Sequence, residues 1–118
     1  MAYTLARDHK IKMAFGSDLL FSQSLTKRQG TMLTHLSRWF TTSEMLKMAT
    51  AANGELLALS GPRNPYPGKL GVVEDGALAD LLLVDGDPLT DIKLLETPEK
   101  NLLVIMKDGK IHKDTLKG

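Results

Sequence analysis

Apolar residues at intervals of three and four positions predict two helices in the first half of the chain. Between residues 25 and 40 they fall on one helix face, although Gly30 weakens that helix. A second helix is expected over residues 41–59, because Thr41 and Glu44 have the spacing of a capping box. The apolar stripe of this second helix consists of Met45, Met48, Ala49, Ala52, Leu56 and Leu59.

Short apolar runs bounded by turn residues predict strands. Residues 11–15 form the first run, and further strands are expected over residues 70–73 and 79–84. Two more strands flank Asp108-Gly109, a pair suited to a type I′ hairpin because both positions need positive φ. The order is strand, helix, helix and then several strands, which indicates an α/β fold.

The length limits the architecture. A chain of 118 residues is one small domain or a piece of a larger one, and a complete (β/α)8 barrel of about 250 residues cannot fit. Residues 61–68 contain three prolines and two glycines, so they form a loop. We therefore divide the chain into residues 1–62, with the first strand and the helices, and residues 63–118, which are rich in β-structure and contain one helical turn at residues 91–95.

Composition excludes several classes of protein. The formal charge is +1, so neither nucleic acid nor an anionic membrane is an expected partner. Lys27, Arg28 and Arg38 lie near Trp39, but helical spacing places Trp39 on the apolar stripe and leaves the cations solvated. No apolar stretch approaches the ~20 residues of a membrane span. The N-terminus lacks the apolar segment of a secretory signal, and the default expectation is the cytoplasm.

The candidate chemistry is sparse, because the chain has no cysteine and only His, Asp and Glu remain as metal ligands. Asp18 directly follows the first apolar run, and catalytic groups in α/β proteins usually follow strands. An aspartate in such a position is also a common helix cap or turn former. His9, His35 and His112 are widely spaced, which favours surface or packing roles over metal binding.

An acidic cluster follows in the second half of the chain. Asp80 lies within an apolar run, where a carboxylate needs a hydrogen-bonding partner, and we expect it to order a turn rather than to perform chemistry. Asp85-Gly86-Asp87-Pro88 lacks the spacing of a calcium loop and is interpreted as a turn.

Four stretches together resemble the amidohydrolase superfamily, metal-dependent hydrolases built on a (β/α)8 barrel. Phe15-Gly16-Ser17-Asp18 is similar to its last barrel strand, and residues 41–50 are similar to the helix that follows it. Residues 69–89 and the hairpin at 104–110 resemble its C-terminal segment, which joins a small β-sandwich. The branch it resembles most is that of the imidazolonepropionase-like and prolidase-like hydrolases. The resemblance implies a C-terminal fragment of the barrel followed by β-sandwich strands.

In that family one or two divalent metals, usually zinc, activate a water molecule that attacks an amide or related C–N bond. The resemblance implies that Asp18 is the aspartate that follows the last strand, which is both a metal ligand and the proton shuttle. It also implies a small amide or dipeptide as the substrate of the intact enzyme.

The chain lacks the other residues of the family's metal site. It has no His-x-His pair, and one aspartate cannot hold a catalytic zinc, which needs about three protein ligands. We therefore expect the chain alone to bind no metal tightly and to be inactive. One hypothesis is an enzyme fragment that needs the missing barrel portion. The alternative is a non-catalytic association module or a subunit of a split enzyme. Since residues 11–15 lack neighbouring strands, self-association into a homo-oligomer is also expected.

Overall fold

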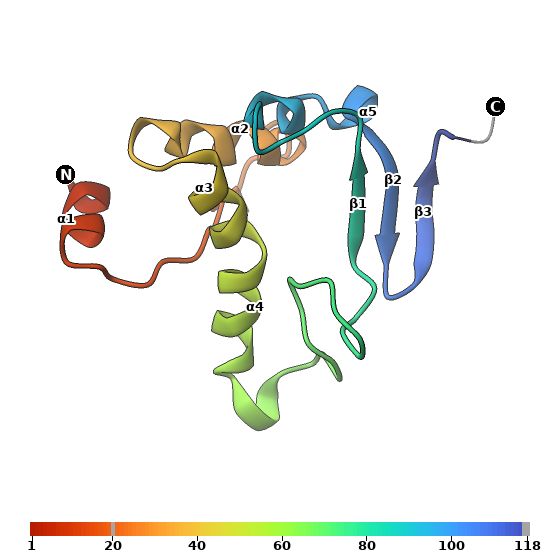
Figure 1. The fold of residues 1–118 in the computed structure, drawn as a ribbon, viewed down its shortest axis with the longest axis horizontal. Helices are drawn as coiled ribbons and strands as arrows, with labels where there is room; N and C mark the ends of the chain where they lie inside the picture. The colour runs from red at the N-terminus through yellow and green to blue at the C-terminus, as the bar shows by residue number, and fades with distance from the viewer. Residues whose placement is uncertain (20, 117–118) are drawn as a thin grey trace.

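The structure is a computed structural model that describes residues 1–19 and 21–116. It combines short helices with a small sheet (Figure 1). In chain order the elements are α1 (Ala2–Asp8), η1 (Thr26–Arg28), α2 (Gln29–Thr34), η2 (His35–Arg38), α3 (Thr42–Ala49), α4 (Ala51–Ala58), η3 (Gly61–Arg63), β1 (Leu81–Val84), η4 (Ile92–Glu96), α5 (Pro98–Asn101), β2 (Leu102–Lys107) and β3 (Lys110–Asp114), where η denotes a 3-10 helix.

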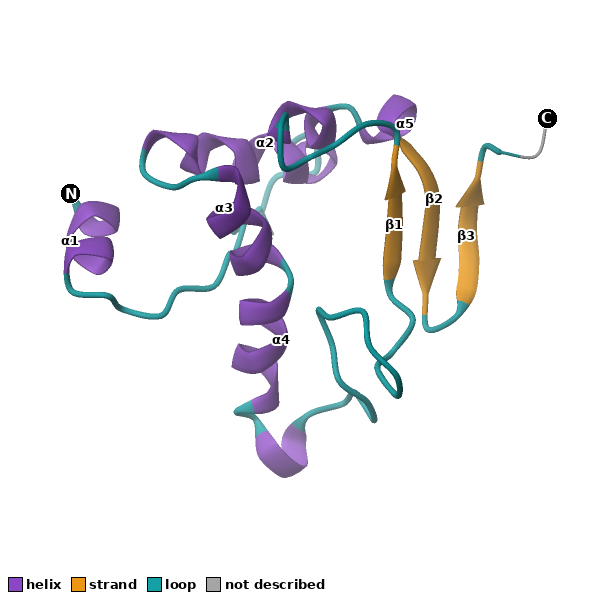
Figure 2. Ribbon diagram, viewed as in Figure 1, coloured by secondary structure: helices purple, strands orange, loops and turns teal. Residues whose placement is uncertain are grey.

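The three strands form one antiparallel sheet in the order β1-β2-β3, to one side of the helices (Figure 2). The hairpin between β2 and β3 is confirmed, since Asp108 and Gly109 have φ values of 48° and 73°. The helical turn expected near residue 91 is also present as η4, where the Asp91 carboxylate accepts a hydrogen bond from the Lys93 backbone. The expected α/β class is therefore confirmed, whereas the assignment of the first half to a barrel remains a prediction.

The helix expected over residues 41–59 is two helices. Its capping box is confirmed, because the Thr41 hydroxyl accepts from the Glu44 N–H and the Glu44 carboxylate accepts from the Thr41 N–H. The helix breaks at Thr50, with φ −120° and ψ −92°. At the break the backbone of Gly71 packs against Thr50, and a Cβ on Gly71 would lie 2.2 Å from the Thr50 carbonyl oxygen. This close approach comes from the loop after α4 and has no signal in the helix sequence.

The helix expected over residues 25–40 is divided into η1, α2 and η2. Gly30 lies in α2 for a reason other than helix propensity. A Cβ at this position would lie 1.7 Å from the carbonyl oxygen of Leu95 in η4, so only glycine permits this contact. The glycine thus allows η4 to lie directly on α2.

Two of the expected strands are absent from the described residues. Residues 11–15 are extended but pair with no described strand, and residues 70–73 contribute no strand either. An isolated bridge between Lys69 and Ala77 is the nearest sheet-like pairing in that loop. The apolar pattern predicted strands at both places, but a strand also requires a hydrogen-bonding neighbour, which the described part of the chain does not provide.

The core lies where α2, η2, α3 and η4 meet. Met45 is fully buried, and Phe15 packs against the cluster from the extended N-terminal segment. Trp39 is half-buried and its ring lies 4.8 Å from that of Tyr3, whereas the cations at positions 27, 28 and 38 are exposed. Among the described helices, none is long and apolar enough to cross a membrane. The buried residues of this cluster are Leu33, Leu36, Met45, Met48 and Ile92.

Candidate functional site

Asp18 lies after the extended N-terminal segment, as the sequence predicts. Its side chain is exposed and makes no hydrogen bond or ion pair with another described residue. Its φ of 50° is in the left-handed region, which aspartate tolerates better than most residues do. No helix begins directly after it, since the next helical element starts at Thr26. The carboxylate is therefore not used as a helix cap.

The segment that carries Asp18 is anchored three residues earlier, at Phe15. The Phe15 N–H donates to the carbonyl oxygen of Met48 at 3.2 Å and to Oδ1 of Asn53 at 3.0 Å. Asn53 in turn donates from Nδ2 to the Ala49 carbonyl oxygen. Because Phe15 also packs on the core, both its backbone and its ring hold the segment that leads to Asp18.

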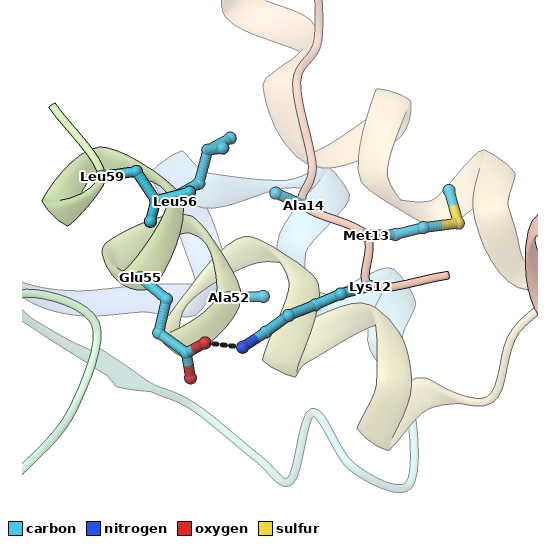
Figure 3. A pocket seen from close by; sticks show the side chains of 7 residues that line it. All are labelled: Lys12, Met13, Ala14, Ala52, Glu55, Leu56 and Leu59. Carbon is cyan, nitrogen blue, oxygen red and sulfur yellow. Dashed lines mark hydrogen bonds and ion pairs between the residues drawn. The ribbon is translucent and has the colours of Figure 1, made fainter. Parts of the chain in front are cut away.

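A cavity of about 470 Å³ lies next to this segment, between residues 12–14 and α4 (Figure 3). Lys12 and Glu55 form an ion pair within it, and the other lining side chains are apolar. Asp18 does not line this cavity. The cavity offers apolar surface and one neutralised charge pair, with no nucleophile or general base that is free to react.

The three histidines lie apart. All of them are exposed, with His9 after α1, His35 in η2 and His112 in β3, which agrees with the surface role that their spacing indicates. Among the described residues there is no group of three or more His, Cys, Asp or Glu that could hold a metal ion. These residues therefore do not fit the metal centre of the amidohydrolase superfamily by themselves.

Asp80 and Asp87 of the acidic cluster have structural roles. Oδ1 of Asp80 accepts a hydrogen bond from the Asp108 N–H at 2.7 Å, so Asp80 orders the hairpin turn, as expected for a carboxylate in an apolar run. Asp87 forms a turn in which its carboxylate accepts from the Thr90 hydroxyl at 2.8 Å and from the Leu89 N–H at 2.9 Å. These hydrogen bonds, that of Thr90 first, lower the pKa of Asp87.

A hollow of about 340 Å³, lined mostly by polar residues, lies between η2 and η4, and no pattern in the sequence indicates it. The buried hydroxyl of Thr34 donates to Oε1 of Glu96 at 2.6 Å across it. The two residues are 62 positions apart, so no local spacing relates them. Arg38 and Lys93 also line this hollow.

The sequence matches no protein-family model and no curated protein. Solved structures do match. An amidohydrolase is 28% identical with a TM-score of 0.83, and the match covers 98% of this chain and 26% of that one. A prolidase complexed with N-methylphosphonate-L-proline is 27% identical with a TM-score of 0.79, over 96% of this chain and 26% of that one. The ochratoxinase of A. niger is 25% identical with a TM-score of 0.77, and the match covers 99% of this chain and 25% of that one.

This chain spans about a quarter of the length of the structures that it matches. The match extends over nearly all of its residues, so helices, loops and sheet are all arranged as in those proteins. The resemblance that the sequence indicates is therefore confirmed: the chain is similar in sequence and fold to the C-terminal part of structures of the amidohydrolase superfamily, among them a prolidase and an ochratoxinase.

Proposed function

We propose that this chain is the C-terminal portion of a metal-dependent hydrolase that cleaves C–N bonds of amides, cyclic amides or dipeptides. The observation that carries this proposal is the match of 98% of the chain to an amidohydrolase at a TM-score of 0.83. The prolidase with a bound proline derivative supports a small amide or dipeptide as the substrate. The site itself supports the proposal only through Asp18.

In this proposal Asp18 supplies one carboxylate to a divalent metal, with zinc as the first candidate, and accepts a proton during the reaction. Its exposure, its lack of a described partner and its anchored segment support this role. A catalytic metal needs about three protein ligands, so the others must come from polypeptide outside this chain. The isolated chain should accordingly bind no metal tightly and have no hydrolase activity.

The experiment compares the isolated chain with a chimaera, in which this chain replaces the matching quarter of a solved amidohydrolase. We expect the isolated chain to bind no stoichiometric zinc and to turn over no dipeptides. We expect the chimaera to bind stoichiometric zinc and to hydrolyse dipeptides. In the chimaera, Asp18→Asn should lower kcat on the order of 10²-fold or more, as loss of a proton-transfer group does. Asp75→Asn, at an exposed loop position, is the matched control.

Two outcomes would contradict the proposal. Stoichiometric metal and turnover by the isolated chain would refute its predicted inactivity. An Asp18→Asn chimaera with unchanged metal content and kcat would refute the role of Asp18, even if the fold assignment holds.

A non-catalytic association module is the second candidate. It is favoured by α4, which has no buried residue although most of its side chains are apolar. A helix of this composition is normally covered by another element.

A further inference from the structure

The side chain of Asn53 joins three parts of the chain. Asn53 lies in α4, and its Oδ1 accepts a hydrogen bond from the Phe15 N–H at 3.0 Å. Its Nδ2 donates to the carbonyl oxygen of Ala49, the last residue of α3, at 3.4 Å. The amide therefore connects α4 both to the end of α3 and to the extended segment that leads to Asp18.

These two partners fix the orientation of the Asn53 amide. A backbone N–H can only donate a hydrogen bond, and a carbonyl oxygen can only accept one. The Asn53 oxygen must therefore face Phe15, and its NH2 group must face Ala49. Side chains of similar size cannot replace both contacts, because an ionised aspartate has no donor and leucine has neither group. The contact thus requires asparagine for a chemical reason.

Phe15 is the last anchored residue before Asp18. Its N–H also donates to the Met48 carbonyl oxygen at 3.2 Å, and its ring packs on the core. Residues 16–18 make no hydrogen bond with another described residue. The chain from Phe15 to Asp18 spans at most about 11 Å. A shift of the Phe15 backbone would therefore reach the Asp18 carboxylate with no other hydrogen bond in the described part of the chain to oppose it.

Asn53 holds this segment from the side of α4. Among the described residues, it provides the only side-chain hydrogen bond to residues 13–18. The Met48 carbonyl ties Phe15 to α3 alone, whereas the Asn53 amide is held at both of its ends. An acceptor that is itself fixed by a second hydrogen bond holds its donor in one place better than a mobile side chain does.

We propose that Asn53 is a positioning residue, which holds the Asp18 carboxylate where the hydrolysis requires it. This inference rests on the function proposed for Asp18. Misplacement of a reacting group by about 1 Å can lower a rate on the order of 10²-fold. Loss of the Asn53 amide should therefore lower kcat through Asp18, without loss of the fold.

The chimaera with a solved amidohydrolase tests this role at saturating zinc and dipeptide. We expect Asn53→Ala to lower kcat about tenfold or more and to change KM less than about threefold. Alanine favours a helix more than asparagine does, so α4 itself should not be weakened. Thr50→Val is the matched control, because it removes the hydrogen bond from the Thr50 hydroxyl to the Leu46 carbonyl at the same helix break. Its kcat should stay nearly unchanged, and circular dichroism checks that each variant is folded.

A double-mutant cycle separates positioning from a general loss of structure. If Asn53 acts through Asp18, Asn53→Ala should lower kcat less than about twofold further in a chimaera that already carries Asp18→Asn. A general loss of structure would lower kcat by the same factor in both backgrounds.

Two further variants divide the contacts of Asn53 and remain informative if Asn53→Ala does not fold. Asn53→Asp keeps an oxygen for the Phe15 N–H and loses the donor to Ala49, so it should retain most of kcat. Asn53→Ser is too short to reach Phe15, but its hydroxyl can donate to the carbonyl oxygen four residues earlier, that of Ala49. It should lower kcat about as much as Asn53→Ala.

The inference is overturned if folded Asn53→Ala and Asn53→Ser keep the kcat of Thr50→Val, or if the cycle shows equal factors in both backgrounds. When Asp18→Asn alone still lowers kcat, either result removes the role of Asn53 and leaves that of Asp18 in place. An Asp18→Asn chimaera with unchanged kcat would instead remove the role of Asp18, and that of Asn53 with it.

Discussion

Asp80 and Asp108 are joined by a hydrogen bond of 2.7 Å, in which the Asp80 carboxylate accepts from the Asp108 backbone N–H. Asp80 precedes β1, and Asp108 lies at the turn between β2 and β3. The Gly109 N–H also donates to the carbonyl oxygen of Ala79. The residues directly before β1 thus hold the turn that connects β2 to β3. These hydrogen bonds link all three strands at one end of the sheet.

Removing this carboxylate should loosen the hairpin. We expect Asp80→Ala to lower the free energy of unfolding by about 1 kcal/mol, the usual value of one net hydrogen bond. Asp80→Asn, which retains an acceptor oxygen, should lower the free energy of unfolding by less. Asp75→Ala should leave it nearly unchanged. Urea unfolding measures all three. Equal stability of Asp80→Ala and the original chain would show that the hydrogen bond does not stabilise the turn.

The contact of Gly30 with Leu95 predicts an unusual result for a helix glycine. Replacing glycine by alanine within a helix normally stabilises a protein by up to about 1 kcal/mol. Here the new methyl group would lie 1.7 Å from a backbone oxygen, so we expect Gly30→Ala to destabilise the fold by about 2 kcal/mol or more. Gly16→Ala is the matched control, since a Cβ there meets no atom within 4 Å. Thermal unfolding of both variants shows whether each substitution stabilises or destabilises the fold.

The capping box predicts a pH dependence. Hydrogen bonds from the Thr41 backbone N–H and hydroxyl lower the pKa of Glu44 below its usual 4.5. Its stabilisation of the folded state is therefore present above about pH 4.5 and is lost as the pH falls through the lowered pKa. Glu44→Gln should unfold more easily than the original chain at pH 7, and the difference should shrink towards pH 3.

Glu99→Gln is the control for that titration, because the exposed Glu99 carboxylate makes no hydrogen bond with a described residue. Its difference from the original chain should stay small between pH 7 and pH 3. Chemical denaturation at several pH values measures both variants. A Glu44→Gln difference that does not change with pH would contradict the proposed origin of the effect.

Zinc should not stabilise the isolated chain. A ligand that binds only the folded state raises its stability according to its concentration relative to Kd. Since the described residues offer no group of three metal-ligating side chains, about 100 µM zinc should leave Tm unchanged within about 1 °C. Asp18→Asn should behave in the same way. A clear rise in Tm that Asp18→Asn abolishes would reveal a metal site within this chain.

The sequence predicts best those features that depend on neighbouring residues. Thr41 with Glu44, and Asp108 with Gly109, act over four positions or fewer, and the structure contains both the cap and the hairpin. Gly71 packs closely against the helix break at Thr50, and the glycine in α2 packs closely against Leu95. Such contacts join residues far apart in sequence, and the helical pattern carries no trace of them.

The error at residues 11–15 has a different origin. Their apolar character predicts burial and extended backbone, and Phe15 does pack on the core. A strand is defined by its partner, however, and the sequence of one segment cannot show whether that partner is present. For the site, the wide spacing of the three histidines correctly indicated that they do not lie together. The role of Asp18 remains a prediction.

The large folded surface also bears on how cooperatively the chain unfolds. The slope of stability against denaturant scales with the surface newly exposed on unfolding. A chain that already exposes 8689 Å² has less left to expose than a compact domain of equal length. As a monomer it should unfold over a broad range of urea concentrations. That range should become narrower once another element covers α4.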